Sequence, residues 1–339
     1  MKLSLIYLTA RVSDSPMIGR PGVHLLTPLL ESLERQSFTD FELILVDTLW
    51  ERRDLLAEAT SLGNWSFPIS LTHPTPGPGA SGGWSKQSSA NNGLVKSCGE
   101  WILQCDDCCE FPDDMLSKMM DATQLGSPHL LCAYKINDKI MTKIPDDPLA
   151  PDTVEKAREL GLWNNDACTR DSRWSLTEAS PAKEYLLGWG QCYAYGCFRR
   201  ESLFRVNGWD ERFDGSKPLG DVELGSRLEL CGLWDAFTTA SLFVYENQHI
   251  PCDQPSLPGC TSPWSNYDLL TWMRQNSMWR ANTQAIPEDD CKRICNCELT
   301  GVDARPEKFL FQDPDENWPR QKAWMRNQKI MELTSIDFC

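Results

Sequence analysis

The first 120 residues alternate short apolar runs with segments that carry helix signals, and this alternation constrains the fold more than any other feature. Apolar, strand-like runs occupy 3–8, 41–46, 69–71 and 100–104. Helix-like segments begin at Thr27, Asp54, Lys86 and Pro112. The first two strand-like runs are almost continuously apolar, as is typical of parallel strands covered on both faces. The β-α-β-α-β order therefore predicts an α/β fold with an open, mostly parallel central sheet flanked by helices.

The later part of the chain has a weaker pattern. Residues 137–185 contain Asp-Pro and Ser-Pro breaks and predict loops and short helices. Aromatic residues favour a strand over 191–198, and 237–245 is apolar and prone to form β-structure. A helix is expected over 221–231, ended by Gly232. From 251 to 339 the chain carries Pro, Cys and scattered Trp, which indicates an irregular extension packed on the main domain.

Charge and hydropathy exclude several classes of partner. The 339 residues include 33 Lys and Arg against 48 Asp and Glu, a formal net charge of −15. This charge repels nucleic-acid and lipid phosphates, so a broad duplex-binding face is disfavoured. No run of about 18 apolar residues occurs, which predicts the absence of a membrane span. The apolar start at 1–10 is short and followed by Arg11, so we expect a first strand instead of a signal peptide and a cytoplasmic location.

The chain has 15 cysteines, an odd number that cannot pair completely within one molecule. In a chain without a secretory signal, mostly buried free thiols are expected. Cys291, Cys295 and Cys297 are closely spaced and, with one more cysteine, could hold a structural Zn²⁺. Their spacing is not the usual paired Cys-x-x-Cys, so free thiols or disulfides are favoured over zinc.

Acidic residues follow two of the predicted strands. Asp47 ends the second apolar run, and Asp106 and Asp107 follow the run at 100–104. Ligands of open parallel sheets bind outside the carboxyl ends of the strands. Carboxylate oxygens are suitable ligands for Mg²⁺ or Mn²⁺, and His249, after a strand-like segment, is a further candidate ligand. The alternatives are an acidic loop or a helix cap before Pro112 and a structural histidine.

A further acidic group, Asp221 and Glu223, lies at the start of the helix expected over 221–231. Carboxylates in a first helical turn are favoured by the helix dipole, which alone accounts for them. The functional alternative is a general base beside a substrate hydroxyl.

Taken in order, these segments resemble a glycosyltransferase of the GT-A fold, and glycosyltransferase family 2 in particular. The resemblance covers roughly residues 1–250. It is carried by TAR at 9–11, LESLERQSFTDFELILVD at 30–47, ANNG at 90–93, GEWILQCDD at 99–107, FRRESLFRVNGWDERFDG at 198–215 and GDVELGSRLELCG at 220–232. It implies one GT-A domain over 1–250, with a nucleotide-sugar-binding half at 1–110 and an acceptor-side half at 111–250, followed by the extension at 251–339.

The resemblance also implies an activity. A metal-dependent enzyme would move a sugar from a nucleotide-diphosphate sugar to an acceptor hydroxyl, and a single in-line displacement would invert the anomeric centre. UDP is favoured as the nucleotide because it is the commoner one in this fold family. The acceptor would be a glycan or another hydroxyl-bearing molecule, with a nucleic acid disfavoured by charge. Mn²⁺ or Mg²⁺ would be held by Asp106, Asp107 and His249, and Asp221 would act as the catalytic base.

The family pattern assigns further residues to the two sides of the site. Those expected to bind the donor are Thr9, Arg11, Asp47, Asn91 and Asp106, with Asp47 facing the base. Those expected on the acceptor side are Trp189, Trp209, Asp210 and Glu223. Tryptophan faces stack on sugar rings, but packing in the core explains the two tryptophans equally well.

The chain departs from the family pattern at two positions. The Asp-x-Asp motif is not literal, and depending on how it is counted its ligand is Asp106 or Asp107, so both are retained. Gly220 stands where the family has the Glu of a Glu-Asp pair. These departures keep open a second hypothesis, a non-catalytic nucleotide-sugar or glycan-binding protein on the same fold. A nucleotidyltransferase is disfavoured, because no Gly-rich basic loop directly follows the first strand.

Overall fold

The computed structural model describes most of the amino-terminal half and part of the remainder. The described residues are 1–14, 22–74, 85–107, 109–124, 130–132, 134–136, 184–185, 195–214, 219–233, 236–238, 242–246, 265–281 and 286–302.

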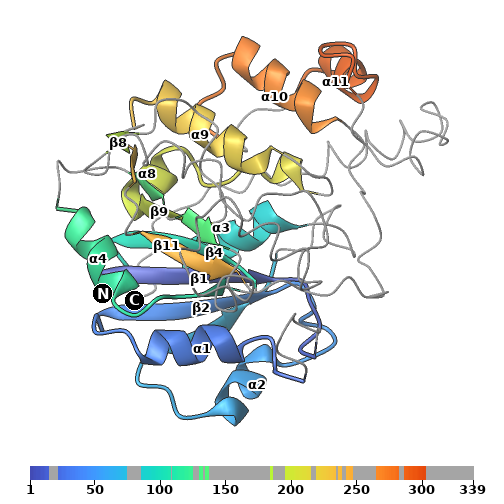
Figure 1. The fold of residues 1–339 in the computed structure, drawn as a ribbon. Helices are drawn as coiled ribbons and strands as arrows, with labels where there is room; N and C mark the ends of the chain where they lie inside the picture. The colour runs from blue at the N-terminus through green and yellow to red at the C-terminus, as the bar shows by residue number, and fades with distance from the viewer. Residues whose placement is uncertain are drawn as a thin grey trace, which may run out of the picture.

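Four parallel strands form the amino-terminal part of the central sheet, in the order β3-β2-β1-β4 (Figure 1). Their bounds are β1 Leu3–Thr9, β2 Phe41–Asp47, β3 Ile69–Thr72 and β4 Trp101–Asp106. All seven residues of β1 are buried, because helices cover both faces of the sheet. The parallel α/β sheet predicted from the alternating pattern is confirmed.

The sheet continues beyond β4 with mixed strand directions. The order is β9-β6-β10-β8, with β9 antiparallel to both β4 and β6, β10 parallel to β6, and β8 antiparallel to β10. A second, smaller sheet has the order β5-β11-β7. The bounds are β5 Cys109–Glu110, β6 Leu130–Cys132, β7 Tyr134–Ile136, β8 Glu184–Tyr185, β9 Gly196–Arg199, β10 Ala236–Thr238 and β11 Phe243–Glu246. The apolar run expected as one strand over 237–245 therefore divides between the two sheets.

Two hydrophobic clusters lie on opposite faces of the sheet, because successive side chains of a strand point to opposite faces. Leu5 and Tyr7 pack with α1, α2 and α4, whereas Ile6 and Leu8 pack with α3, α8 and α9. Figure 1 shows α1 and α2 on the side of the sheet away from α8 and α9. The bounds are α1 Thr27–Glu34, α2 Leu55–Leu62, α3 Lys86–Lys96, α4 Met115–Ala122, α8 Arg200–Arg205, the 3₁₀ turn η1 Glu211–Phe213 and α9 Gly220–Leu230.

The helix signals read from the sequence hold to different degrees. Asp54 caps α2 as expected, its Oδ1 accepting hydrogen bonds from the N–H groups of Leu56 and Ala57 at 3.1 Å each. Thr27 is the first residue of α1 instead of its cap, and no side chain caps that helix. The helix expected from Pro112 begins three residues later, at Met115.

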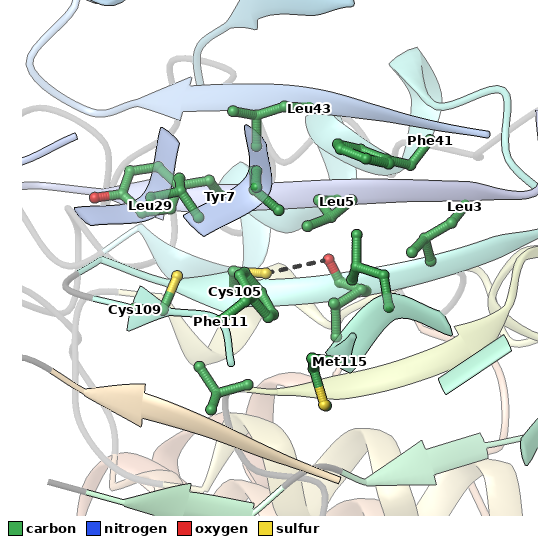
Figure 2. Packing of buried hydrophobic residues seen from close by; sticks show 14 of the residues in the cluster. Leu3, Leu5, Tyr7, Leu29, Phe41, Leu43, Cys105, Cys109, Phe111 and Met115 are labelled. Carbon is green, nitrogen blue, oxygen red and sulfur yellow. Dashed lines mark hydrogen bonds between the residues drawn. The ribbon is translucent and has the colours of Figure 1, made fainter. Parts of the chain in front are cut away.

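Cys105 and Cys109, which flank the acidic pair in the sequence, belong to the hydrophobic core. Both are buried beside Phe111 and Met115 (Figure 2), and the Cys105 thiol lies 3.8 Å from the carbonyl oxygen of Leu103. A buried cysteine packs as a small apolar side chain. These two residues therefore fill space in the hydrophobic core, and packing accounts for their burial.

Helix α3 lies very close to β1, and a glycine makes this approach possible. A Cβ atom placed on Gly93 would lie 2.3 Å from Cγ2 of Ile6, far inside contact distance. The close approach packs α3 directly against β1, and the first residue of α3, Lys86, lies beside Asp106 at the end of β4.

The region expected to be irregular contains two helices, α10 (Asn266–Gln275) and α11 (Glu288–Cys295). The apolar positions of α10 pack with α11 and with Phe213 of η1. This helical spacing is present in the sequence but lies between segments rich in Pro and Cys, which drew the interpretation toward irregular structure. Among the described residues, no helix has the length and apolar character needed to cross a bilayer.

The cysteines of α11 and its end are buried. They are Cys291, Cys295 and Cys297, and burial raises the pKa of the Cys291 thiol to about 12. A zinc ligand is a thiolate, which such an environment disfavours. Cys98, by contrast, is disulfide-bonded, so the expectation of mostly free thiols has at least one exception.

Candidate active site

The carboxyl ends of three neighbouring strands bring together residues that are far apart in the sequence. In the strand register, Thr9 of β1 lies opposite Asp47 of β2, and Leu8 of β1 lies opposite Asp106 of β4. The acidic residues therefore meet at one edge of the parallel sheet, where the ligands of such folds bind.

Asp107 holds the turn that follows β1. Its Oδ1 accepts a hydrogen bond from Nε of Arg11 at 3.1 Å, and its Oδ2 accepts one from the hydroxyl of Thr9 at 3.3 Å. The Thr9 hydroxyl also accepts the N–H of Arg11 at 3.2 Å. Thr9 and Arg11, both expected to bind the donor, are thus fixed against Asp107, a candidate metal ligand.

Asp47 is completely buried and paired with an arginine that the sequence interpretation missed. Nε and one terminal nitrogen of Arg53 donate to the two carboxylate oxygens at 2.7 and 2.8 Å, and the N–H of Leu49 donates at 2.9 Å. This bidentate pair orders the turn after β2. The expected contact of Asp47 with a nucleotide base stays a prediction, and the observed contacts give the side chain a positioning role.

Lys86, the first residue of α3, lies between two acidic elements. Its Nζ is 3.0 Å from Oδ1 of Asp106 and 3.9 Å from Oδ1 of Asp221, and its side chain is 16% exposed. Burial alone would lower the pKa of Lys86, but the Asp106 and Asp221 carboxylates hold it above its usual value. The sequence interpretation missed Lys86, because nothing in its local pattern indicates that α3 begins beside β4.

Asn91 is buried and joins α3 to the segment before η1. Its amide nitrogen donates to the carbonyl oxygen of Trp209 at 2.9 Å and to the carboxylate of Glu211 at 2.8 Å. Its amide oxygen accepts the N–H of Trp209 at 2.8 Å. These bonds hold α3 against the segment at 209–211, and the donor-binding role expected for Asn91 stays a prediction.

The described residues expected on the acceptor side lie beneath the surface. Trp209 is buried, with its ring edge against Phe198, whereas Asp210 and Glu223 each bind a guanidinium group. Burial opposes ionisation of Asp210, yet the Arg212 guanidinium holds the pKa of Asp210 below its usual value. These three side chains therefore make structural contacts in the interior, and a direct contact with an acceptor stays a prediction. Trp189 and His249 lie outside the described residues.

Gln87 fills the space beside Gly220. A Cβ atom on Gly220 would lie 1.7 Å from Nε2 of Gln87, so no larger side chain fits there unless Gln87 moves. The Oε1 atom of Gln87 is buried and makes no hydrogen bond within the described structure. Where the family pattern has the Glu of a Glu-Asp pair, this chain therefore has Gly220, and Gln87 of α3 fills the space beside it.

Asp214 caps the start of α3, although it lies 127 residues from Gln87 in the sequence. Its carboxylate accepts the N–H groups of Gln87 and Ser88 at 2.8 and 2.9 Å. Burial nevertheless raises the pKa of Asp214 to about 8, and the carboxylate of Glu211 acts in the same direction.

Because the pKa of Asp214 is higher in the folded protein than in the unfolded chain, its stabilising contribution is present at low pH. That contribution is lost as the pH rises toward about 8. We expect Asp214→Asn, which cannot titrate, to gain stability relative to the wild type between about pH 5 and pH 8.5. Urea unfolding midpoints of both proteins across this range measure the difference, and parallel profiles would contradict the assignment.

Comparison with known proteins supports the fold. No family model and no curated protein matches the chain. The structure of S. aureus TarS 1–349 in complex with UDP has a TM-score of 0.53 at 14% identity, with 95% of this chain and 78% of that chain covered.

Two further structures are similar at lower scores. S. aureus TarS 1–349 without a named ligand has a TM-score of 0.47 at 14% identity, and this chain covers 60% of its length. The mannosyltransferase PcManGT from Pyrobaculum calidifontis, in complex with GDP-Man and Mn²⁺, has a TM-score of 0.45 at 13% identity, with 99% of this chain and 88% of that chain covered. The sheet order, its helical layers and the TarS–UDP likeness establish that the chain has the GT-A fold.

Proposed function

We propose that the protein is a metal-dependent, inverting glycosyltransferase that moves a sugar from a nucleotide-diphosphate sugar to an acceptor hydroxyl. The observation that carries the proposal is that Lys86 lies between Asp106, at the end of β4, and Asp221, at the start of α9, while the adjacent Asp107 pairs with Arg11. A UDP-sugar is the favoured donor, since the similar TarS fold binds UDP. The acceptor class we propose is a glycan or another hydroxyl-bearing molecule.

The carboxylate oxygens at the end of β4 are suitable ligands for a hard divalent cation. Asp106 and Asp107 offer carboxylate oxygens, and their side chains are 35% and 16% exposed. Each already pairs with a cationic side chain, Arg11 or Lys86, which shows that both carboxylates are placed to attract positive charge. Mn²⁺ or Mg²⁺ bound there, with His249 as a proposed further ligand, would stabilise charge on the leaving diphosphate. Within the described part of the chain, no group of three or more His, Cys, Asp or Glu residues is arranged to hold a metal, and this applies also to the proposed zinc site at 291–297.

The other roles in the proposed reaction belong to side chains of the protein. Asp221 lies in the first turn of α9, 3.9 Å from the ammonium of Lys86, where its carboxylate would accept the proton of the acceptor hydroxyl. Arg11 and Thr9, fixed by Asp107, line the side where the donor would lie. Attack by the acceptor oxygen on the anomeric carbon, with departure of the diphosphate from the opposite face, inverts the configuration.

The reaction is tested by measuring nucleotide release from a panel of UDP- and GDP-sugars. We expect UDP release that Mn²⁺ or Mg²⁺ stimulates by about 10²-fold and that EDTA removes, because the cation stabilises the leaving group. Readdition of the metal after EDTA is the control for loss of protein. Equal release with and without metal would contradict the metal dependence, and no release from any donor would contradict the enzyme assignment.

The second candidate function, a non-catalytic nucleotide-sugar or glycan-binding protein, is favoured by one observation. Gln87 takes the space beside Gly220, where a second acidic side chain would stand next to Asp221. A binding protein would bind UDP or a UDP-sugar and leave the sugar attached. Calorimetric binding without nucleotide release, in the same preparation, would favour this alternative.

A further inference from the structure

The carboxamide of Gln87 lies against the first turn of α9, the helix that carries Asp221. A Cβ atom on Gly220, the first residue of α9, would lie 1.7 Å from Nε2 and 2.9 Å from Cδ of Gln87. Gln87 is 4% exposed, and its backbone N–H group donates to Oδ1 of Asp214 at 2.8 Å. The side chain therefore extends from a fixed backbone position and occupies the space that a side chain at position 220 would need.

The turn before α9 has a backbone conformation that needs support from its neighbours. Leu219 has a φ of 86°, in the left-handed region that residues other than glycine rarely adopt. A strained residue of this kind persists only where the surrounding packing holds it. The side chain of Leu219 packs against the cluster that contains Phe213 and α10, and Gln87 meets the next residue, Gly220, from α3. Two separate contacts therefore hold the start of α9, and Gln87 provides one of them.

The amide group of Gln87 has a spare hydrogen-bond acceptor beside this turn. Within the described structure its Oε1 atom is buried and has no hydrogen-bond partner, a state that costs free energy and that a methionine of similar size would avoid. A half-turn of the carboxamide would bring Oε1 to the place of Nε2, beside Gly220. The N–H groups of a first helical turn have no acceptors within their own helix, and no side chain at the N-cap residue Leu219 binds them. The carboxamide is therefore suited to cap α9 from α3.

We propose that Gln87 is a positioning residue for Asp221: its carboxamide holds the first turn of α9 and thereby keeps the Asp221 carboxylate where it meets the acceptor hydroxyl. This inference rests on the proposed function, because Asp221 is the base of that reaction. It also gives the glycine before Asp221 a reason. Gly220 leaves the room that Gln87 occupies, so the residues at positions 87 and 220 form a matched pair, one large and one without a side chain.

The first test separates the rate of the reaction from donor binding in Gln87→Met, which keeps the length of the side chain and removes the amide. We expect kcat for UDP release from the most active UDP-sugar of the panel to fall by about 10- to 100-fold, because a small misplacement of a base slows proton transfer. The affinity for UDP, measured by calorimetry, should not change. Gln275→Met, the same substitution at an exposed position of α10, is the matched control and should behave as the wild type does. Wild-type kcat in Gln87→Met, or an equal loss of UDP affinity, would overturn the inference. If Gln87→Met does not fold, Gln87→Leu gives the same comparison.

A reciprocal exchange tests the pairing of positions 87 and 220. Gly220→Glu alone should release UDP at least about 100-fold more slowly than the wild type, because the new side chain needs the space of Gln87. Gln87→Ala combined with Gly220→Glu removes this overlap and places a carboxylate in the first turn of α9, where the helix dipole favours it. We expect the double variant to be at least about tenfold faster than Gly220→Glu. If it is no faster, the two positions are not paired and the inference is wrong.

Urea unfolding tests the same pair without any need for activity. The double variant should unfold at a higher urea concentration than Gly220→Glu, because the overlap with Gln87 is absent. Failure of the proposed function has its own signature: the wild type releases no nucleotide from any sugar donor, yet the double variant is more stable than Gly220→Glu. If the double variant is no more stable than Gly220→Glu, Gln87 does not hold α9, and the inference fails whether or not the protein is an enzyme.

Discussion

Asp221→Asn is expected to lower the rate of sugar transfer by about 10²- to 10⁴-fold, the usual contribution of a positioned base, and to leave donor binding intact. The amide keeps the size of the carboxylate but cannot accept the acceptor's proton. Nucleotide release in the presence of acceptor measures the rate, and calorimetry with UDP measures binding. A loss of rate with unchanged affinity would identify Asp221 as the base.

The matched control for this substitution is Glu229→Gln, which removes a carboxylate from an exposed position of the same helix. It should turn over as the wild type does, so that a general effect of charge on α9 is excluded. Normal turnover of Asp221→Asn would remove Asp221 from the mechanism. Loss of UDP binding in that variant would instead assign Asp221 to the donor side.

The amino-terminal half of the fold could be predicted from the sequence, because each of its strands has a recognisable local pattern. Buried parallel strands such as Phe41–Asp47 are mostly apolar, and Asp54 and Gly63 mark the ends of α2. Beyond β4 the predicted strands over 191–198 and 237–245 overlap β9, β10 and β11, but the other strands and the mixed directions could not be predicted, since strands this short carry little periodicity. Helices α10 and α11 were missed because Pro and Cys in neighbouring segments obscured a helical apolar pattern.

The candidate site was predictable only as far as strand ends are predictable. Asp47, Asp106 and Asp107 follow from the rule that ligands bind at the carboxyl edge of a parallel sheet. Lys86 was not found, because its partners Asp106 and Asp221 come from tertiary packing and no local pattern records it. Arg53 was also missed, although its partner Asp47 ends the strand that precedes it in the sequence. Asp210 and Glu223 resemble site residues in the sequence, whereas the structure buries them with guanidinium partners that are close in the sequence; burial of these pairs is what the sequence did not show.

Arg227→Met is expected to destabilise the protein by about 3–5 kcal/mol, the usual cost of leaving one member of a buried ion pair without its partner. Arg227 is 1% exposed and pairs with Glu223 one helical turn away. Its terminal nitrogens also donate to the carbonyl oxygens of Val206 and Gly208, at 2.7 and 2.8 Å. The substitution therefore leaves a buried carboxylate and two buried carbonyl groups without their donor. Urea unfolding followed by circular dichroism measures the change.

We expect most of this loss of stability to come from the unpaired carboxylate of Glu223. A second substitution can separate the contribution of that charge from the contribution of lost packing. Arg227→Met combined with Glu223→Gln removes the buried charge, so we expect it to be more stable than Arg227→Met alone. Arg205→Met, at an exposed position of α8, should change the free energy of unfolding by less than about 0.5 kcal/mol. If the double variant is no more stable than the single one, the two carbonyl contacts, and not the ion pair, are what Arg227 contributes. Arg227 would then stabilise α9, the helix that carries Asp221, by binding the backbone carbonyl groups of the turn at 206–208.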